Sequence, residues 1–311
     1  MPDVLKQRES AGGRHFAGPV LVTGASGFIG RHLCSSLAAS GDDVHAVVRT
    51  ASTRDSLNPH EVTLHTVRSS TQEFAAVADD VQPAVVFHLA TLYLPRHQPA
   101  EIAGMLEANV IFGTTVAACA ARGGARLVHT TSAWQHYAGA EYSPASLYAA
   151  TKQALCDVIQ YFTESGGLRA DEVCLFDTYG PRDDRKKLMW LLLEHAASGA
   201  PLPMSSGLQL VDLTHVDDVV AALLHVATGP PLGARLVARS GRPLTIRAVA
   251  ALVEQVTGRA IDARWGDRPA RPREMERDWV VSGTDTSWRP QVDLPTGVAQ
   301  LWDERMGPRD R

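Results

Sequence analysis

The chain alternates short β-branched runs with longer helical stretches, and this pattern limits the fold more than any other feature of its 311 residues. The short runs cover residues 19–23, 44–49, 62–67, 84–89, 127–131 and 173–176, and the clearest helical stretches cover 29–39, 101–121, 147–163 and 217–227. Strands with little polar alternation, separated by helices, are typical of a parallel sheet that is covered on both faces. The sequence therefore predicts an α/β fold built on a doubly wound parallel sheet.

The regularity weakens after Gly180, and Pro and Gly become denser at 229–241 and 266–290. Such a change in composition indicates a second, smaller unit. We predict a flexible N-terminus at 1–18, a domain around the large sheet at 19–180 with 209–228 returning to it, and a smaller α/β substrate-binding lobe at 181–311.

The net charge, the apolar runs and the cysteines limit the classes of partner and the compartment that we expect for this chain. The chain has 30 Lys and Arg against 34 Asp and Glu, a formal net charge of -4, which argues against a general affinity for nucleic acid or an anionic membrane. No apolar run approaches the roughly 20 residues that cross a bilayer, and 1–18 lacks the apolar centre of a secretion signal. The four cysteines, which are Cys34, Cys119, Cys156 and Cys174, lie in apolar stretches without metal-ligand spacing. We therefore expect reduced thiols in the core, no bound metal, and a cytoplasmic protein.

A glycine-rich segment at 24–30 follows the first predicted strand directly and opens the first predicted helix. Glycines at such a corner let the backbone turn tightly and approach a pyrophosphate, whose charge lies on the exposed amides of the helix N-terminus. A plain strand-to-helix corner is the alternative, and the position at the first strand favours the dinucleotide interpretation. The candidate cofactor contacts are Gly24, Ser26, Gly27, Phe28, Ile29 and Gly30.

The end of the second predicted strand indicates which dinucleotide is bound. A domain that prefers NAD usually places Asp or Glu at this corner, against the adenine ribose. Val48 and Arg49 stand there instead, and a guanidinium suits the 2′-phosphate of NADP. We therefore expect NADP(H) as the preferred cofactor, with NAD(H) possible if Arg49 is only a solvated residue.

Tyr148 and Lys152 are four residues apart in a predicted helix, so their side chains share one face. A cation beside a phenol favours the phenolate and lowers the phenol pKa, which would make Tyr148 a proton donor and acceptor near neutral pH. Ser132 follows the predicted strand 127–131, at the carboxyl edge where open α/β sheets bind ligands. Its hydroxyl can hydrogen-bond a substrate carbonyl, so Ser132, Tyr148 and Lys152 are the predicted catalytic residues.

The glycine loop with GxxGxxG spacing, Ser132 and the Tyr148/Lys152 pair, in this order, resemble the extended short-chain dehydrogenase/reductases of the NAD-dependent epimerase/dehydratase family. The resemblance implies a Rossmann fold, a substrate hydrogen bond from Ser132, acid/base catalysis by Tyr148, and a Lys152 that binds the nicotinamide ribose and tunes Tyr148. It also implies further cofactor contacts at Leu89, Ala90, Thr91, Asn109 and Thr130, besides Tyr148 and Lys152.

Three later segments resemble enzymes of this family that act on nucleotide sugars, and their FDTYGP and RPREM variants resemble 4-ketoreductases of deoxysugar synthesis such as CDP-abequose synthase. Two residues depart from the family pattern: Asp177 replaces an Asn, and Val211 replaces a phosphate-contacting Arg. Lys187 ends a charged run that is otherwise typical of a solvated helix start. The candidate substrate contacts are Ser132, Trp134, Asp177, Lys187, Arg271 and Arg273, with Arg271 or Arg273 as the replacement for the missing Arg.

The resemblance leaves three functions open. Related 4,6-dehydratases have an Asp-Glu pair directly after the catalytic Ser/Thr, and Ala133 and Trp134 stand there instead, which argues against dehydration. We expect NADPH-dependent reduction of a keto group, at C4, of a dTDP- or CDP-linked 6-deoxyhexose. The alternatives are a 4-epimerase with tightly bound NAD and a non-catalytic NADP-binding regulator. The helices at 101–121 and 147–163 resemble those that pair in the family's homodimers.

Overall fold

The computed structural model describes residues 15–49, 57–58, 60–68, 71–231, 235–279 and 287–307. The large sheet contains β1 (Val20–Thr23), β2 (Val44–Val48), β3 (Thr63–Thr66), β4 (Val85–His88), β5 (Arg126–Ser132), β6 (Arg169–Leu175) and β11 (Leu236–Ala238). All neighbouring pairs are parallel, and the order across the sheet is β11-β6-β5-β4-β1-β2-β3. This confirms the predicted doubly wound parallel sheet.

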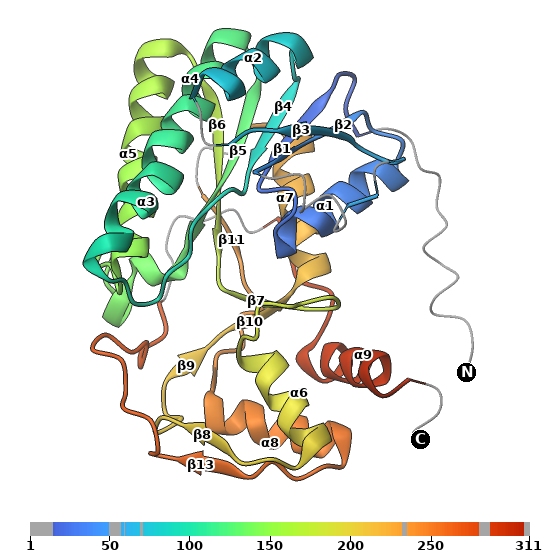
Figure 1. Ribbon diagram of the computed structural model, residues 1–311, viewed down its shortest axis with the longest axis vertical. Coiled ribbons are helices and arrows are strands. Elements are labelled where there is room, and N and C mark those ends of the chain that lie inside the picture. The colour runs from blue at the N-terminus through green and yellow to red at the C-terminus, as the bar shows by residue number, and fades with distance from the viewer. Residues whose placement is uncertain are drawn as a thin grey trace.

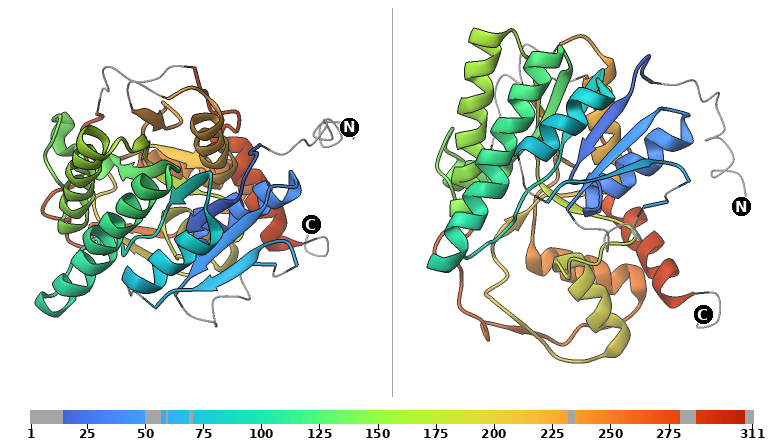
Figure 2. Two further views of the ribbon diagram at one scale, coloured as in Figure 1. Left: turned by 90° about the horizontal axis from the view of Figure 1, so that it is seen from above. Right: turned by 45° about the horizontal axis from the view of Figure 1, so that its top comes forward.

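Helices cover both faces of this sheet. On one face lie α2 (Thr71–Val81), α4 (Phe112–Gly123) and α5 (Leu147–Gly166), side by side, and on the other lie α1 (Phe28–Ala39) and α7 (Val216–Thr228) (Figure 1, Figure 2). Along β1, Val20 and Val22 belong to the core beneath α1 and α7, whereas Leu21 belongs to the core on the opposite face. Strand side chains alternate between faces, so a strand that is apolar throughout has to be covered on both.

Local signals fix the ends of the helix that contains Tyr148. The Ser146 hydroxyl accepts a hydrogen bond from the Ala149 amide at 3.3 Å and caps the N-terminus of α5. Gly167 ends the helix in a left-handed conformation with φ 66°, which glycine adopts without steric cost. The cap places Tyr148 in the first turn, at the carboxyl edge of the sheet.

The helical run Pro99–Gly123 corrects one expectation. It contains α3 (Ile102–Leu106), a π-helical turn (Glu107–Ile111) and α4, and by length and composition it could cross a membrane, with a mean hydropathy of 1.5. A search for unbroken apolar runs overlooks it because Gly, Thr and Asn interrupt the sequence. In the structure Val116 and Ala120 of α4 pack in the core with α2 and α5, whereas Ile102, Leu106 and Ile111 in the first half of the run are exposed.

A smaller lobe lies below the carboxyl edge of the sheet (Figure 1). Its helices are α6 (Leu188–Ser198), α8 (Ile246–Thr257) and α9 (Leu294–Met306). Short strands pair around them: β7 (Asp177–Tyr179) with β10 (Leu213–His215), β9 (Leu210–Val211) with β12 (Leu244–Thr245), and β8 (Leu202–Met204) with β13 (Ala263–Trp265). The lobe has its own core, which includes Leu192, Val249 and Val298.

The chain crosses between the two parts several times. Helix α7 packs on β6 and β11, and β11 pairs with β6 at the edge of the large sheet. Residues 236–238 therefore belong to the large sheet, although they lie inside the range 181–311 that was predicted to form the lobe. This strand is too short to stand out in the sequence. Of the predicted flexible N-terminus, residues 1–14 lie outside the described residues. At its end, Phe16 packs against Phe87 and His15 hydrogen-bonds Asp42.

Asp218 of α7 binds the segment that leads into α9. Its buried carboxylate accepts hydrogen bonds from the backbone amides of Gln291 at 2.9 Å and Val292 at 3.0 Å. The N-cap of α7 is His215, whose Nδ1 accepts from the Asp217 amide at 3.3 Å. Asp218 is therefore a structural acceptor between the two parts of the molecule.

Candidate active site

A cleft of about 720 Å³ opens where the sheet strands end and the lobe begins. Residues that follow the carboxyl ends of β1, β2, β4, β5 and β6 all contribute to its wall. Those predicted from the sequence are Gly24, Ser26, Gly27, Phe28, Ile29, Gly30, Arg49, Leu89, Ala90, Thr91, Thr130, Ser132, Trp134, Tyr148, Asp177 and Lys187. The structure thus brings most of the candidate cofactor and substrate contacts together in one cleft.

The glycine loop leaves room for an anion at the start of α1. Gly24 has φ +68°, and a Cβ on it would lie 2.6 Å from the Ala90 amide nitrogen, so only glycine fits there. Gly27 is the N-cap of α1, no side chain caps its first-turn amides, and no acidic residue lies in that turn. Uncapped amides and the positive end of the helix dipole fit the pyrophosphate of a dinucleotide.

Arg49 is exposed where β2 ends, at the same end of the cleft as Val47, Val48 and Val67. These valines give this end of the cleft an apolar lining. A planar adenine fits such a surface, and an adjacent phosphate fits the guanidinium.

Ser132 and Tyr148 meet in the middle of the cleft. Ser132 is the last residue of β5, and its hydroxyl accepts from the Trp134 amide at 3.3 Å. Tyr148 projects from the first turn of α5, and hydrogen bonds with Ser132 and Thr91 lower its pKa. The two hydroxyls are therefore close enough to contact one substrate oxygen.

The predicted lowering of the Tyr148 pKa by Lys152 is wrong, because the shift has the opposite direction. Burial raises the pKa of Tyr148 well above its usual value, and the charge of a deprotonated Tyr93 would raise it further, which outweighs the hydrogen bonds from Ser132 and Thr91. A phenol in an apolar wall has to be neutral, because the phenolate would lose its hydration. Tyr148 therefore holds its proton at neutral pH.

Lys152 lies one turn after Tyr148 and is 3% exposed, and it is not among the residues that line the cleft. Burial lowers its pKa to about 8, against contributions from Cys156 and Glu172 that raise it. His88 and His129 are buried nearby, and burial together with the charge of Lys152 lowers the pKa of each to about 3, so both are neutral. Lys152 is the remaining cation of this buried group.

Asn109 supports the cleft wall from behind. It lies in the π-helical turn Glu107–Ile111 and is buried. Its side-chain carbonyl accepts from the Thr91 hydroxyl at 3.0 Å and the Leu92 amide at 2.7 Å, and its amide donates to the Thr151 hydroxyl at 3.0 Å. The structure thus places Asn109 as a residue that positions Thr91, whereas a direct cofactor contact was predicted.

Aromatic and charged side chains form the other end of the cleft. Tyr93 packs edge-on against Trp134, and Lys187 lies 4.7 Å from the Tyr93 ring centroid. Asp177 faces Lys187 and Arg271, and burial raises the pKa of its carboxyl while these cations lower it. This end can bind a ligand that has both a sugar ring and negative charge.

The two candidate arginines of the segment after β13 have different surroundings. Arg271 lies 5.2 Å from the Trp134 ring centroid and hydrogen-bonds Tyr93. Arg273 lies 4.1 Å from the Tyr137 ring centroid, donates to the Ser143 hydroxyl, and is not a cleft residue. Arg271 does not line the cleft either, but of the two arginines only Arg271 contacts residues of the cleft wall, Trp134 and Tyr93.

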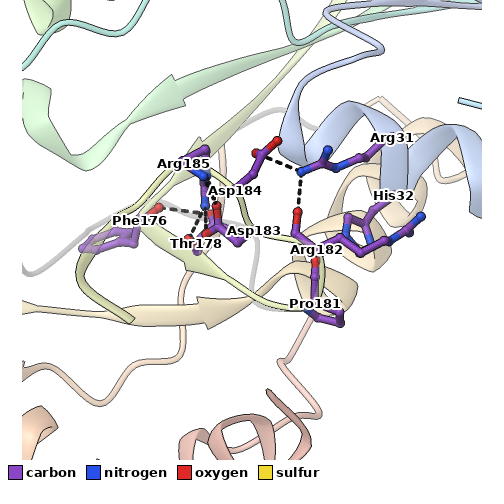
Figure 3. A network of polar contacts seen from close by, with 9 residues as sticks. All are labelled: Arg31, His32, Phe176, Thr178, Pro181, Arg182, Asp183, Asp184 and Arg185. Atoms are coloured by element: carbon purple, nitrogen blue, oxygen red, sulfur yellow. Dashed lines mark hydrogen bonds and ion pairs between the residues drawn. The ribbon is translucent and has the colours of Figure 1, made fainter. Parts of the chain in front are cut away.

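The loop between β7 and α6 contains a cleft residue that the sequence analysis missed. The guanidinium of Arg185 donates to the Asp183 carboxylate and to the Thr178 carbonyl (Figure 3). It also lies 4.0 Å from the Phe28 ring centroid. Tyr93 was missed as well. Neither belongs to a motif, and only the proximity of Tyr93 to the predicted segment 89–91 could have indicated it.

The sheet, the uncapped glycine loop and the Ser132/Tyr148 pair define an enzyme that uses a nicotinamide dinucleotide. The chain matches the NAD dependent epimerase/dehydratase family over residues 20–235 and belongs to it. It is therefore an extended short-chain dehydrogenase/reductase of the nucleotide-sugar epimerase, dehydratase and synthase group, which confirms the family predicted from the sequence.

Relatives with several activities are similar to this chain. CDP-abequose synthase of Salmonella typhimurium is 27% identical over 213 residues, covering 67% of this chain and 69% of that protein. UDP-glucose 4-epimerase of Mycolicibacterium smegmatis is 26% identical over 310 residues, covering 90% and 96%. The solved UDP-glucose 4-epimerase of Thermus thermophilus in complex with NAD has a TM-score of 0.82 at 24% identity, covering 93% of this chain and 99% of that one, which shows the shared fold.

Proposed function

We propose that the protein catalyses NADPH-dependent reduction of a keto group, at C4, of a dTDP- or CDP-linked 6-deoxyhexose. The observation that carries this proposal is the position of Tyr148 beside Ser132 on the cleft wall, where its hydroxyl keeps its proton at neutral pH as an ordinary phenol does. A reduction begins with a proton on the acid, whereas an oxidation begins with that proton removed.

NADPH, when bound, supplies the hydride for the keto carbon and leaves as NADP⁺. Tyr148 donates its proton to the carbonyl oxygen, so that the ketone gains one hydride and one proton and becomes an alcohol. The Ser132 hydroxyl hydrogen-bonds the same oxygen as negative charge develops on it. The Lys152 ammonium stabilises the phenolate that Tyr148 leaves behind, and solvent then restores the Tyr148 proton.

The residues after Ser132 support reduction over dehydration. Ala133 is buried and Trp134 lines the cleft, so neither place offers a carboxyl group for an elimination. Trp134 instead adds an apolar surface beside the substrate. Such a surface suits the C6 methyl group of a deoxysugar.

The charges at the two ends of the cleft support the assignment of cofactor and substrate. Arg49 would bind the 2′-phosphate of NADP(H) beside the adenine site. Lys187 and Arg271 would bind the nucleotide sugar, with Asp177 holding both cations in place. NAD(H) would then bind more weakly, because it has no group to pair with Arg49.

The test is NADPH consumption by the purified enzyme with dTDP-, CDP- and UDP-linked 4-keto-6-deoxyhexoses, followed by identification of the product. We expect stoichiometric NADPH loss with at least one substrate and a hydroxyl group at the former keto carbon. Tyr148→Phe is the inactive control. A folded, cofactor-loaded enzyme that oxidises no NADPH with any of these substrates would contradict the proposal.

A 4-epimerase with tightly bound NAD is the second candidate. The similarity to the Mycolicibacterium smegmatis epimerase over 90% of this chain favours it. An epimerase would purify with about one equivalent of NAD, interconvert UDP-sugars and consume no added NADPH. The cofactor content of the purified protein therefore separates the two candidates.

We further propose that the enzyme acts as a cytoplasmic homodimer. Ile102, Leu106, Ile111 and Tyr161 leave apolar side chains exposed on the run Pro99–Gly123 and on α5. A second copy of the chain could cover this face. Light scattering of the wild type and of Leu106→Lys would test it, with a monomeric variant as the expected result.

A further inference from the structure

Arg185 occupies the part of the cleft between the glycine loop and the substrate end. We infer that Arg185 binds a diphosphate group there, either that of the cofactor or that of the nucleotide sugar. The inference rests on the proposed function, because it deepens the account of how that cleft binds its two ligands.

The guanidinium is oriented before any ligand binds. Nε and Nη2 of Arg185 donate to the two carboxylate oxygens of Asp183, each at 2.7 Å, and Nη2 also donates to the Thr178 carbonyl at 2.7 Å. In the described part of the chain, no hydrogen bond is formed by Nη1. The hydrogen bonds to Asp183 and Thr178 use the N–H groups of Nε and Nη2 and leave the two N–H groups of Nη1 available to an anion.

Arg185 lies between the sites proposed for the two ligands. Its guanidinium is 4.0 Å from the ring centroid of Phe28, the first residue of α1 and the neighbour of the uncapped Gly27. It also lowers the pKa of Asp177, together with Lys187 and Arg271. Arg185, Lys187 and Arg271 therefore face two carboxylates, Asp177 and the Asp183 that pairs with Arg185, and a diphosphate would balance the remaining positive charge.

The loop that contains Arg185 is attached to α1. Arg31 donates to the Arg182 carbonyl and to the Asp184 carboxylate, and Nε2 of His32 lies 3.0 Å from the Pro181 carbonyl (Figure 3). Arg182 and Lys186 have φ values of +58° and +51°, which residues other than glycine rarely adopt. Strained backbone of this kind persists where surrounding contacts enforce it and is concentrated at functional sites.

The experiment measures binding and not turnover. The full-length wild type and the variants Arg185→Gln and Arg247→Gln are titrated calorimetrically with NADPH, with CDP, dTDP and UDP, and with the matching nucleoside monophosphates. Arg247 is the control, because its guanidinium also lies on an aromatic ring, Trp265, and donates to a backbone carbonyl, that of Ser206, outside the cleft.

We expect Arg185→Gln to weaken the binding of a diphosphate ligand about 10- to 100-fold, as for the loss of a charge-assisted hydrogen bond. Binding of the monophosphates should change by less than about threefold, and Arg247→Gln should match the wild type. A loss confined to the nucleoside diphosphates would assign Arg185 to the nucleotide sugar, and a loss confined to NADPH would assign it to the cofactor. Unchanged binding of both would overturn the inference.

Two further variants decide the matter if Arg185→Gln does not fold. Arg185→Lys keeps the charge without the planar fork, and Asp183→Asn keeps the guanidinium without its bidentate partner. Both should weaken diphosphate binding by a smaller factor, and wild-type affinities in both would overturn the inference.

A wild type that binds NADPH but no nucleoside diphosphate would count against the proposed substrate. One that binds neither would overturn the proposed function and this inference together.

Discussion

The ring of Tyr93 stands at 86° to the ring of Tyr148, with the two centroids 4.9 Å apart. Tyr93 also meets Trp134 at 85°, with centroids 5.9 Å apart, so three aromatic rings form one continuous wall of the cleft. Edge-to-face contacts of this kind fix the orientation of both rings. The Tyr148 hydroxyl is therefore directed by its aromatic neighbours as well as by Ser132.

Removing the Tyr93 ring should loosen this wall. We expect Tyr93→Ala to lower kcat by about tenfold or more, because a small misplacement of an acid is costly in rate. Tyr93→Phe keeps the ring and loses the hydrogen bond with Arg271, so it should mainly raise KM. Steady-state kinetics of both variants would show the split, and equal kcat values for the two would contradict it.

Tyr148→Phe should abolish proton transfer while preserving the packing of the ring. We expect kcat to fall by about 10²- to 10⁴-fold, the usual contribution of a positioned acid. NADPH affinity should stay within about threefold of the wild type. The control is Tyr161→Phe, on the exposed face of the same helix. A Tyr148→Phe enzyme with wild-type turnover would remove Tyr148 from the mechanism.

The buried ammonium group of Lys152 should lower the free energy of unfolding of the protein and raise its turnover. Its folded pKa of about 8 lies below the ordinary 10.5, so the unfolded chain binds more protons between these values and the wild type gains stability as pH rises through that window. Lys152→Met should lose this rise and be more stable at pH 7, by on the order of 1–3 kcal/mol. Denaturant unfolding at several pH values would measure both effects.

The same titration predicts a pH dependence of turnover. Activity of the wild type should fall as pH rises through about 8, because Lys152 then loses the charge that stabilises the Tyr148 phenolate. Lys186→Met, at an exposed position outside the cleft, is the matched control and should keep this profile. A flat profile in the wild type would argue against a charged Lys152 in the reaction.

Arg49 should set the choice of cofactor. Arg49→Glu would place a carboxylate beside the adenine ribose, which repels a 2′-phosphate and accepts hydrogen bonds from ribose hydroxyls. We expect the ratio of kcat/KM for NADPH to that for NADH to fall by about 10- to 100-fold. An unchanged ratio would mean that Arg49 is only a solvated residue at a strand end.

Asp218 should matter for stability and not for chemistry. Asp218→Ala leaves the Gln291 and Val292 amides without their buried acceptor, at a cost of about 2–4 kcal/mol in the free energy of unfolding. Asp217→Ala, whose side chain is 42% exposed, should cost no more than about 1 kcal/mol. Thermal unfolding of the two variants provides the comparison.

The sheet and the position of Ser132 and Tyr148 in one cleft could be predicted because each has a local signal. A strand such as β1 is apolar at every residue, and the glycine loop that follows it allows few backbone paths. Ser132 and Tyr148 follow from the same logic, since one ends a strand and the other starts a capped helix. Residues fixed by the element that contains them can be predicted from the sequence.

The rest depends on contacts between distant segments. Arg271 and Arg273 are two residues apart, and only the path of the chain directs one to Trp134 and the other to Tyr137. The charged run around Arg185 resembles a solvated helix start until its Asp183 and Phe28 contacts are known. The direction of the Tyr148 pKa shift likewise depends on the burial of its side chain in the folded protein, which no spacing in the sequence indicates.

The π-helical turn Glu107–Ile111 means that the long helix contains one residue more than a regular α-helix would need over the same length. Deleting that surplus residue would restore ordinary helical hydrogen bonding, but would rotate everything before it by about 100° relative to α4. Asn109 could then no longer reach both Thr91 and Thr151. The irregular turn thus makes the helix less regular but allows Asn109 to align the segments that contain Thr91 and Thr151. We expect a regular helix to lose this alignment and the enzyme to be less active.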